Sequence, residues 1–271
     1  MNYFKMPLKL SMQQGLPDYT ALSVLGEDDL NMLSAFLMRA LSRHTCRPRL
    51  LKIGGAVSVG KTTLAVQIRD RLQLLSPQAQ IVLLSTDHFL MNNKALLSHC
   101  GLEHKGFPES YDPDLLDQFF SAWVAGRSLP RLPVYSHQHY DHIPGAFQQL
   151  PYPDVLIVEG VVALNSACVS AQGFGLFVDA PEACMEQWYA ARFLHLCLEA
   201  RACGAGFFSK FSSLSDAEIL ARAKATWVGI NRPNAVKHIE PTRAQAQCVL
   251  VKKQDHAWAS CEIDPVYCKD Q

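Results

Sequence analysis

One stretch of the sequence reads Gly55-Ala56-Val57-Ser58-Val59-Gly60-Lys61-Thr62 and fits the pattern G-x-x-x-x-G-K-[ST]. The apolar run at residues 50–53 precedes it, and residues 63–75 after it have apolar side chains at helical spacing. The motif therefore lies between a predicted strand and a predicted helix. A glycine-rich turn in this place points backbone N–H groups and a helix N-terminus at phosphates, so the sequence predicts a nucleotide phosphate-binding loop.

The polar groups of this loop have expected partners. Lys61 would reach the β- and γ-phosphates of ATP, and the Thr62 hydroxyl would bind Mg²⁺. The alternative is a glycine-rich strand-to-helix turn with a solvated lysine. The residues expected to bind ATP in this segment are Gly55, Ala56, Val57, Ser58, Val59, Gly60, Lys61, Thr62 and Thr63.

Outside the loop, short apolar runs alternate with segments of helical spacing. The runs at residues 80–84, 154–158 and 176–178 are typical of buried strands, and the helical segments are residues 30–41, 115–125, 181–192 and 215–228. Strands separated by helices predict parallel crossovers and helices on both faces of the sheet. The fold class is therefore α/β: a three-layer fold of the P-loop type with a mostly parallel central sheet, whose ligands bind at the carboxyl ends of the strands.

The sequence contains no internal repeat and no low-complexity linker, which favours a single domain over residues 1–271. Residues 1–48 would form a lead segment and a helix, and residues 49–271 the core. The glycine- and phenylalanine-rich stretch at residues 204–211 predicts a lid near residues 200–212. Residues 130–153, dense in Pro, His and Tyr, predict an extended segment or a hairpin.

Composition excludes several classes of protein. The 25 Lys and Arg balance the 25 Asp and Glu, so no overall charge favours nucleic acid or a membrane surface. No stretch approaches the roughly 20 apolar residues of a membrane-spanning helix, and residues 1–17 lack the pattern of a secretory signal. The nine cysteines, without a C-x-x-C pair, suit reduced thiols. We expect a soluble, cytoplasmic protein.

Three further residues are expected to act around the transferring phosphoryl group. Asp87, just past the second strand, would orient the acceptor hydroxyl, since a loose transition state needs orientation more than basicity; its alternative role is to cap a turn. Glu159 follows a buried strand and would support Mg²⁺, because a buried acid must be paired or near a metal. Arg192 would reach the γ-phosphate, with a surface salt bridge as the alternative.

Other motifs accompany the loop in a fixed order. They are Ser85-Thr86-Asp87-His88-Phe89-Leu90, Lys105-Gly106-Phe107-Pro108-Glu109-Ser110-Tyr111-Asp112, Pro133-Val134-Tyr135-Ser136-His137, Tyr140-Asp141, Leu156-Ile157-Val158-Glu159-Gly160, Asp179-Ala180-Pro181-Glu182, Trp188-Tyr189 with Arg192-Phe193, Ile230-Asn231 and Pro241-Thr242-Arg243. In this order and spacing the sequence resembles the type I pantothenate kinases over about residues 50–258. The motifs at residues 105–112 and 133–137 are far more specific than the phosphate-binding loop.

The resemblance implies ATP- and Mg²⁺-dependent phosphorylation of pantothenate at its primary hydroxyl, the first step of coenzyme A biosynthesis. It also implies a homodimer that coenzyme A inhibits by feedback. By position it assigns hydroxyl orientation to Asp87, pantothenate hydrogen bonds to Tyr135, His137, Tyr189 and Asn231, a pocket for the substrate's tail to Tyr140, Phe193 and Phe208, and stacking near adenine to His256. For each aromatic residue, plain core packing is the alternative.

The sequence departs from this family at three positions. His88 stands where the family has glycine, which would narrow the acceptor site. Val66 replaces an arginine that meets coenzyme A, so feedback inhibition is in doubt, and Leu196 replaces an aromatic residue of the pocket wall.

Other functions fit parts of the sequence. His137, His139, Asp141 and His142 fit H-x-H-x-D-H, the metal motif of metallo-β-lactamase-like hydrolases, because imidazoles at alternating positions share one strand face. A related P-loop kinase acting on uridine, glycerate or ribulose phosphate would keep the loop, Asp87 and Glu159. A nucleotide-binding regulator without turnover is the third alternative.

Overall fold

The computed structural model describes residues 9–10, 20–22, 27–43 and 49–267 of the chain. The predicted lead segment before residue 27 therefore lies almost entirely outside the described residues. The helix predicted after it is confirmed, because α1 covers Glu27–Arg43. Among the described helices, none combines the length and the apolar composition that a membrane crossing requires.

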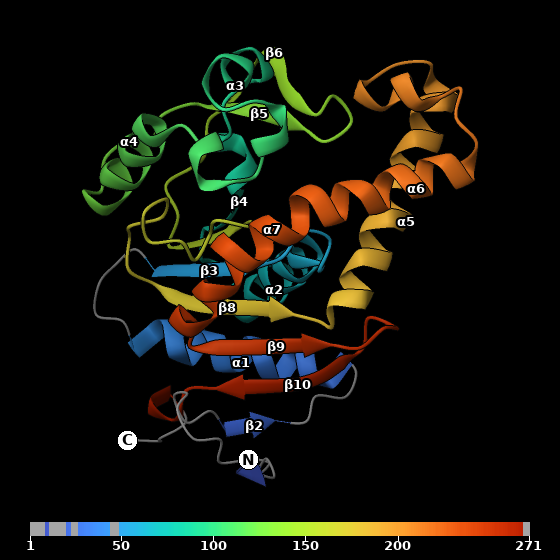
Figure 1. The fold of residues 1–271 in the computed structure, drawn as a ribbon. Helices are drawn as coiled ribbons and strands as arrows, with labels where there is room; N and C mark the ends of the chain where they lie inside the picture. Colours follow the sequence, from blue (N-terminus) through green and yellow to red (C-terminus); the bar gives the residue numbers. More distant parts are fainter. Residues whose placement is uncertain (1–8, 11–19, 23–26, 44–48, 268–271) are drawn as a thin grey trace.

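An eight-stranded sheet with the order β1-β2-β10-β9-β8-β3-β7-β4 forms the centre of the molecule (Figure 1). Strands β4, β7, β3, β8 and β9 are parallel, and β10, β2 and β1 extend the sheet in antiparallel pairs. The mostly parallel sheet is thus confirmed. Its strands are β1 (Lys9–Leu10), β2 (Thr20–Leu22), β3 (Arg49–Gly55), β4 (Ile81–Ser85), β7 (Val155–Glu159), β8 (Phe174–Asp179), β9 (Cys248–Lys252) and β10 (Trp258–Ile263).

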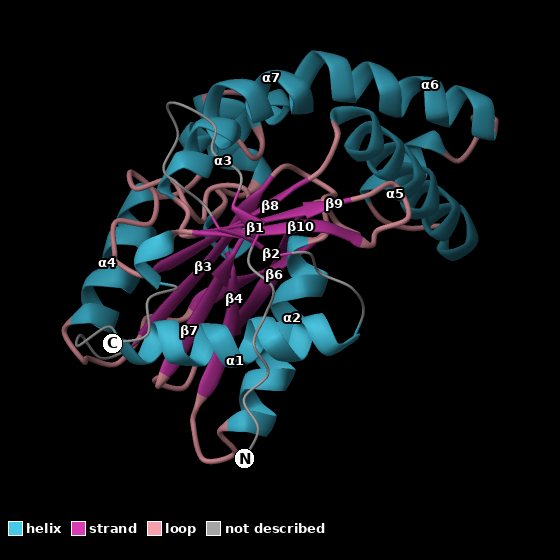
Figure 2. Ribbon diagram, turned by 90° about the horizontal axis from the view of Figure 1, so that it is seen from below, coloured by secondary structure: helices cyan, strands magenta, loops and turns pink. Residues whose placement is uncertain are grey.

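Helices cover both faces of this sheet, because its central strands are apolar on both sides (Figure 2). Along β3, Leu51 and Ile53 belong to an apolar cluster with α1 and α2 (Lys61–Leu75), whereas Leu50 belongs to a second cluster with α4 (Pro113–Val124). The predicted three-layer α/β fold is confirmed. The remaining helices are α2 (Lys61–Leu75), α3 (Asn93–His99), α4 (Pro113–Val124), α5 (Glu182–Cys203), α6 (Asp216–Thr226) and α7 (Arg232–Asn234).

A separate hairpin stands beyond the carboxyl end of β4 (Figure 1). Strand β5 (Leu132–Ser136) pairs antiparallel with β6 (Asp141–Gln148), which confirms the hairpin predicted in residues 130–153. The stretch predicted as a lid contains the 3₁₀ turn η4 (Phe207–Phe211) between α5 and α6. Its action as a lid stays a prediction.

The chain after α6 was not predicted from the sequence. Two turns of π-helix flank α7, a 3₁₀ turn follows, and β9 and β10 then complete the sheet. These turns are η5 (Trp227–Asn231), η6 (Ala235–Ile239) and η7 (Glu240–Gln245); the other 3₁₀ turns are η1 (Thr86–Phe89), η2 (Leu102–His104), η3 (Pro108–Ser110) and η8 (Pro265–Tyr267).

Candidate active site

The predicted phosphate-binding loop joins the end of β3 to the start of α2. Gly55 has φ 141°, and a Cβ there would collide with the carbonyl oxygen of Val178 in β8. Gly60 has φ 92° in the left-handed region and is the residue before α2. No side chain caps the N-terminus of α2, so its first N–H groups remain available to an anion.

Lys61 is the buried cation of this loop. Its side chain is only 7% exposed, and its Nζ donates a hydrogen bond of 2.7 Å to the Ala56 carbonyl oxygen. Burial lowers the pKa of Lys61 to about 8, against the opposing attraction of Glu159 and Asp87, while Arg192 lowers it further. The fold therefore brings together the four residues that the sequence placed at the reacting centre.

Two carboxylates approach Lys61 from neighbouring strand ends. Ser85 of β4 pairs with Glu159 of β7, and Asp87 lies two residues after Ser85, in η1. The Ser85 hydroxyl accepts a hydrogen bond from the Asp87 N–H, so Ser85 caps this turn and the Asp87 carboxylate does not. Asp87 is thus left to face the cavity, as its predicted role requires.

Glu159 is buried beside Thr62. Burial raises the pKa of Glu159, while Lys61 and side-chain hydrogen bonds with Ser85 and Thr62 favour its ionised form. A hydroxyl and a carboxylate are the hard oxygen donors that Mg²⁺ prefers. Thr62 and Glu159 therefore fit the metal site predicted for them.

A cavity of about 440 Å³ extends from the phosphate-binding loop to an aromatic wall. Val57, Ser58, Lys61, Thr62 and Glu159 line its loop end. Every residue predicted to bind the substrate lines it as well: Asp87, Tyr135, His137, Tyr140, Tyr189, Arg192, Phe193, Phe208 and Asn231. Arg192 makes no ion pair with any described residue, so the surface salt bridge considered for it is not formed.

Besides these charged groups, the cavity contains neutral polar side chains. His137 Nε2 lies 3.6 Å from Asp87 Oδ2, and burial lowers the pKa of His137 although Asp87 raises it. Burial also raises the pKa of Tyr135 and Tyr140, so both hydroxyls keep their protons. The Asn231 Nδ2 is buried without a hydrogen-bond acceptor among the described residues.

Aromatic rings form the wall of the cavity farthest from the loop. The ring centroids of Phe193 and Phe208 are 5.5 Å apart, and those of Tyr140 and Phe207 are 4.5 Å apart. Phe207 and Phe208 belong to η4, so the segment predicted as a lid contributes to this wall. Leu196, where the resemblance leads one to expect an aromatic residue, lines it too.

His256 lies outside this cavity. Its ring stacks on Trp188 with centroids 4.2 Å apart and an interplanar angle of 22°, and Trp188 donates a hydrogen bond to the Gln254 carbonyl oxygen. One face of the imidazole is therefore covered by Trp188. Stacking near adenine, which would use the other face, stays a prediction.

Two buried lysines near the site were missed by sequence reasoning. Lys105 lines the cavity, donates hydrogen bonds to Asn93 Oδ1 (2.6 Å) and the Tyr140 carbonyl oxygen (2.5 Å), and has its pKa lowered to about 8 by burial. Its motif at residues 105–112 was the available signal. Lys252 is 7% exposed, and a Cβ on Gly60 would lie 2.5 Å from its Nζ. It belongs to β9, which the sequence did not reveal.

The proposed zinc motif is wrong. His137 faces Asp87, His139 Nδ1 lies 2.9 Å from Ser136 Oγ, and Asp141 Oδ1 accepts hydrogen bonds from the backbone N–H groups of Asn93 and His142. The described residues contain no group of three or more His, Cys, Asp or Glu side chains able to hold a metal ion. The spacing of these four residues had suggested that their side chains meet at one metal ion. The turn between β5 and β6 directs them to different places instead.

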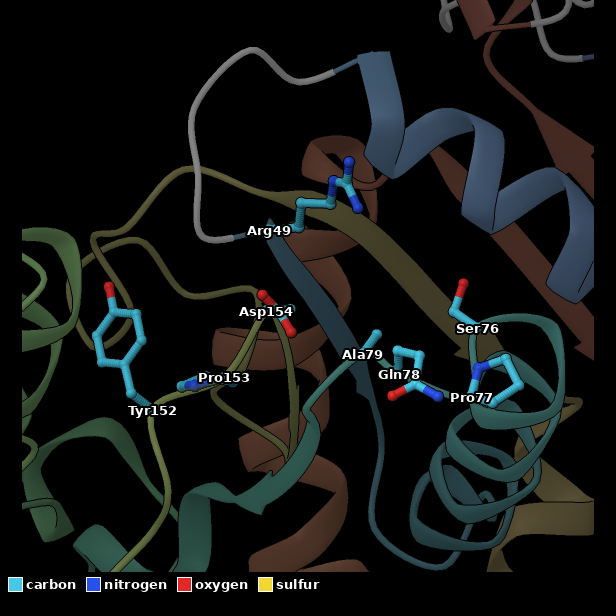
Figure 3. A pocket seen from close by; sticks show the side chains of 8 residues that line it. All are labelled: Arg49, Ser76, Pro77, Gln78, Ala79, Tyr152, Pro153 and Asp154. Carbon is cyan, nitrogen blue, oxygen red and sulfur yellow. The ribbon is translucent and has the colours of Figure 1, made fainter.

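A second cavity, of about 560 Å³, lies at the opposite edge of the sheet (Figure 3). It is lined near the amino ends of β3, β4 and β7, by Arg49, Ser76, Pro77, Gln78, Ala79, Tyr152, Pro153 and Asp154. No residue of the phosphate-binding loop lines it. The reacting groups therefore belong to the first cavity, at the carboxyl ends of the strands.

The loop, the sheet and the cavity beside them define a P-loop phosphotransferase. Residues 50–185 match the phosphoribulokinase/uridine kinase family, and the chain belongs to that family. More narrowly, its relatives are pantothenate kinases. It is 38% identical over 234 residues to the pantothenate kinase of Clavibacter michiganensis subsp. michiganensis, which covers 84% of this chain and 72% of that protein. It is 39% identical over 229 residues to that of Sorangium cellulosum, covering 82% and 73%.

Solved structures share the fold at low sequence identity. D-glycerate 3-kinase from Cryptococcus neoformans var. grubii has a TM-score of 0.59 and 12% identity, covering 88% of this chain and 100% of that one. The YGR205w protein has a TM-score of 0.61 and 14% identity, covering 87% and 98%. These likenesses support the fold and say nothing about the acceptor.

Proposed function

We propose that the protein transfers the γ-phosphoryl group of ATP to the primary hydroxyl of pantothenate and forms 4′-phosphopantothenate, the first step of coenzyme A biosynthesis. One observation carries this proposal: a single cavity joins Lys61 and Thr62 of the loop to Asp87 and a wall of tyrosine, histidine and asparagine side chains. The names of the relatives give the same acceptor.

The residues around the transferring phosphoryl group divide the work. Backbone N–H groups of the loop and the N-terminus of α2 hold the polyphosphate, while Lys61 and Arg192 neutralise charge on the γ-phosphate. Thr62 and Glu159 would hold Mg²⁺, which would reduce the charge repulsion of the phosphate oxygens. Asp87 accepts a hydrogen bond from the acceptor hydroxyl, aims it in line with the γ-phosphorus and takes its proton late in the transfer.

Selectivity for pantothenate follows from the other groups of the cavity. Tyr135, His137, Tyr189 and Asn231 offer hydrogen bonds to a hydroxyl- and amide-rich molecule, and an acceptor that left them unpaired would bind poorly. The aromatic wall with Tyr140, Phe193 and Phe208 would take the apolar part of the substrate's tail.

A coupled assay of ADP release across pantothenate, uridine and D-glycerate tests the acceptor. Pantothenate should give a kcat/KM far above the other two, and turnover of uridine or glycerate alone would overturn the proposal. Lys61→Met should lower kcat by orders of magnitude, whereas Lys94→Met, on the exposed side of α3, is the matched control and should leave it unchanged.

Coenzyme A is the proposed feedback inhibitor, acting on a cytoplasmic homodimer. Val66 on α2 is half-buried and lacks the charge with which an arginine would hold an anionic inhibitor. We expect coenzyme A to inhibit Val66→Arg more strongly than the wild type in assays at fixed ATP; equal inhibition of both would show that Val66 does not limit inhibition by coenzyme A. Sedimentation equilibrium tests the homodimer.

A further inference from the structure

The outer edge of β5 is covered by a side chain. β5 pairs with β6 along one edge, and within the described residues this small sheet has only two strands. Between the pairs Pro133–Phe147 and Tyr135–His142, β5 advances by two residues and β6 by five, so the irregularity lies in β6 and β5 itself is continuous. Tyr135 of β5 and His137, which follows this strand, line the acceptor cavity.

His88 occupies the free edge of β5. Its Nδ1 lies 2.9 Å from the Pro133 carbonyl oxygen and 3.3 Å from the Tyr135 backbone nitrogen. In a strand, the carbonyl of one residue and the N–H two residues later point to the same edge, where a neighbouring strand would bind them. The imidazole therefore lies where a third strand would pair, although Nδ1 can bond only one of these two groups.

The two contacts of Nδ1 are not equivalent. In the neutral ring Nδ1 either donates or accepts, and a carbonyl oxygen only accepts. The shorter contact is the hydrogen bond of the tautomer with the proton on Nδ1, which donates to the Pro133 oxygen; in that tautomer Nδ1 does not accept from the Tyr135 N–H. Burial lowers the pKa of His88, which is consistent with a neutral ring.

His88 connects this strand to the acceptor-orienting turn. It follows Asp87 directly in η1, and His137 after β5 lies 3.6 Å from the Asp87 carboxylate. The turn and the strand are thus joined twice, through His88 and through the Asp87–His137 contact. His88 itself does not line the cavity, so it cannot touch the acceptor there.

We propose that His88 is a positioning residue, which sets the separation between Asp87 and the acceptor-binding residues Tyr135 and His137 by bonding the backbone of β5 at Pro133. The inference rests on the proposed acceptor site. A glycine at this position, which the family resemblance leads one to expect, has no side chain to make the bond. His88 therefore provides a contact between turn and strand that a glycine at this position could not form.

Three variants of His88 separate positioning from general packing. His88→Ala removes the bond, His88→Asn keeps a nitrogen at the distance of Nδ1 from the backbone, and His88→Gln places it one bond farther. We expect His88→Ala and His88→Gln to raise KM for pantothenate roughly fivefold, the worth of one hydrogen bond, with KM for ATP unchanged. His88→Asn should stay within about twofold of the wild type.

A matched control and a double-mutant cycle complete the test. His139→Ala removes an imidazole of the same hairpin that bonds Ser136, and it should leave both KM values unchanged. If His88 acts through β5, His88→Ala should add little to the effect of Tyr135→Phe on KM for pantothenate. The proposal would be overturned if the effects of His88→Ala and Tyr135→Phe on this KM multiplied fully in the double variant. A loss of thermal stability in His88→Ala without a change in this KM would also overturn it.

The outcomes distinguish this inference from the proposed function. If the wild type phosphorylates uridine and not pantothenate, the proposed function fails, and the same KM comparison with uridine still decides the role of His88. If His88→Ala does not fold, the comparison of His88→Asn with His88→Gln decides it. Equal KM values for these two variants would exclude a bond from Nδ1.

Discussion

The buried ammonium group of Lys61 lowers the stability of the protein as long as no phosphate is bound in the loop. The pKa of Lys61 is lowered to about 8 from 10.5, so between these values the unfolded chain binds more protons than the folded one. The stability of the protein therefore rises with pH across this window. Below about pH 8 both states carry the charge, and its burial costs about 3 kcal/mol, a cost that bound polyphosphate would offset.

This cost predicts that Lys61→Met changes the pH dependence of unfolding. The free energy of unfolding of the wild type, relative to that of the variant, should rise by up to about 3 kcal/mol between pH 8 and 10.5. Urea unfolding of both proteins without nucleotide, at several pH values, measures this difference. A difference that stays flat or falls across the window would contradict the burial of a charged Lys61. Lys105, with a similar pKa, is present in both proteins and cancels.

Substitution of Asp87 should lower kcat and leave KM for pantothenate nearly unchanged. Asp87→Asn keeps the size of the side chain and removes the charge that orients and finally deprotonates the acceptor hydroxyl. We expect kcat to fall about 100-fold or more while KM for pantothenate changes little. Steady-state kinetics over a range of pantothenate concentrations checks this split; a raised KM with unchanged kcat would mean that Asp87 only binds the acceptor.

At the scale of elements, the motif at residues 105–112 combines two kinds of residue. Lys105 lines the cavity, whereas the Ser110 hydroxyl accepts from the Gly106 N–H and donates to the Phe107 carbonyl oxygen. Asp112 is the N-cap of α4 and accepts a hydrogen bond of 3.0 Å from the Leu115 N–H. Most of this specific motif therefore shapes a loop that delivers one lysine to the site.

The cap predicts a structural effect without a catalytic one. Asp112→Ala should lower the free energy of unfolding by about 1 kcal/mol, because it leaves the Leu115 N–H without its acceptor. kcat and KM at a temperature well below the melting point should stay unchanged. Chemical denaturation together with steady-state assays checks both, and a large loss of kcat would show that Asp112 also serves the reaction.

Whole elements were predictable where apolar periodicity was long and local. The strands and helices around the loop, with Asp87 and Glu159 at neighbouring strand ends, followed from such patterns. Residues 227–245 did not, because π-helical and 3₁₀ turns interrupt the 3.6-residue period there. Strand β9 was missed with them, and so was Lys252, whose place beside Gly60 depends on pairing between distant segments.

At the scale of the molecule, the sequence did not predict in which direction the side chains point. The spacing of His137, His139, Asp141 and His142 suggested one shared face, yet the tight turn before β6 directs them to different partners. The cavity, by contrast, collects substrate residues from segments far apart in the chain, and the family resemblance had named each of them. Resemblance carried information about tertiary arrangement that periodicity does not contain.

Ligand binding should stabilise the whole fold. A non-hydrolysable ATP analogue with Mg²⁺, at 100 times its dissociation constant, would add about 2.7 kcal/mol to the free energy of unfolding. We expect a clear rise in melting temperature for the wild type and a much smaller one for Lys61→Met at the same concentration. Equal rises in both proteins would exclude Lys61 from nucleotide binding.

The strand order also governs how the chain can be made. β3 emerges early from the ribosome, but its two neighbours, β7 and β8, are translated far later. Until Glu159 has emerged neither edge of β3 has its native partner, and until Asp179 has emerged the edge that pairs with β8 stays open. Nascent chains stalled before that point should bind cellular chaperones strongly. Pairing between such distant segments is slow, and it leaves hydrophobic surface and unpaired strand edges exposed.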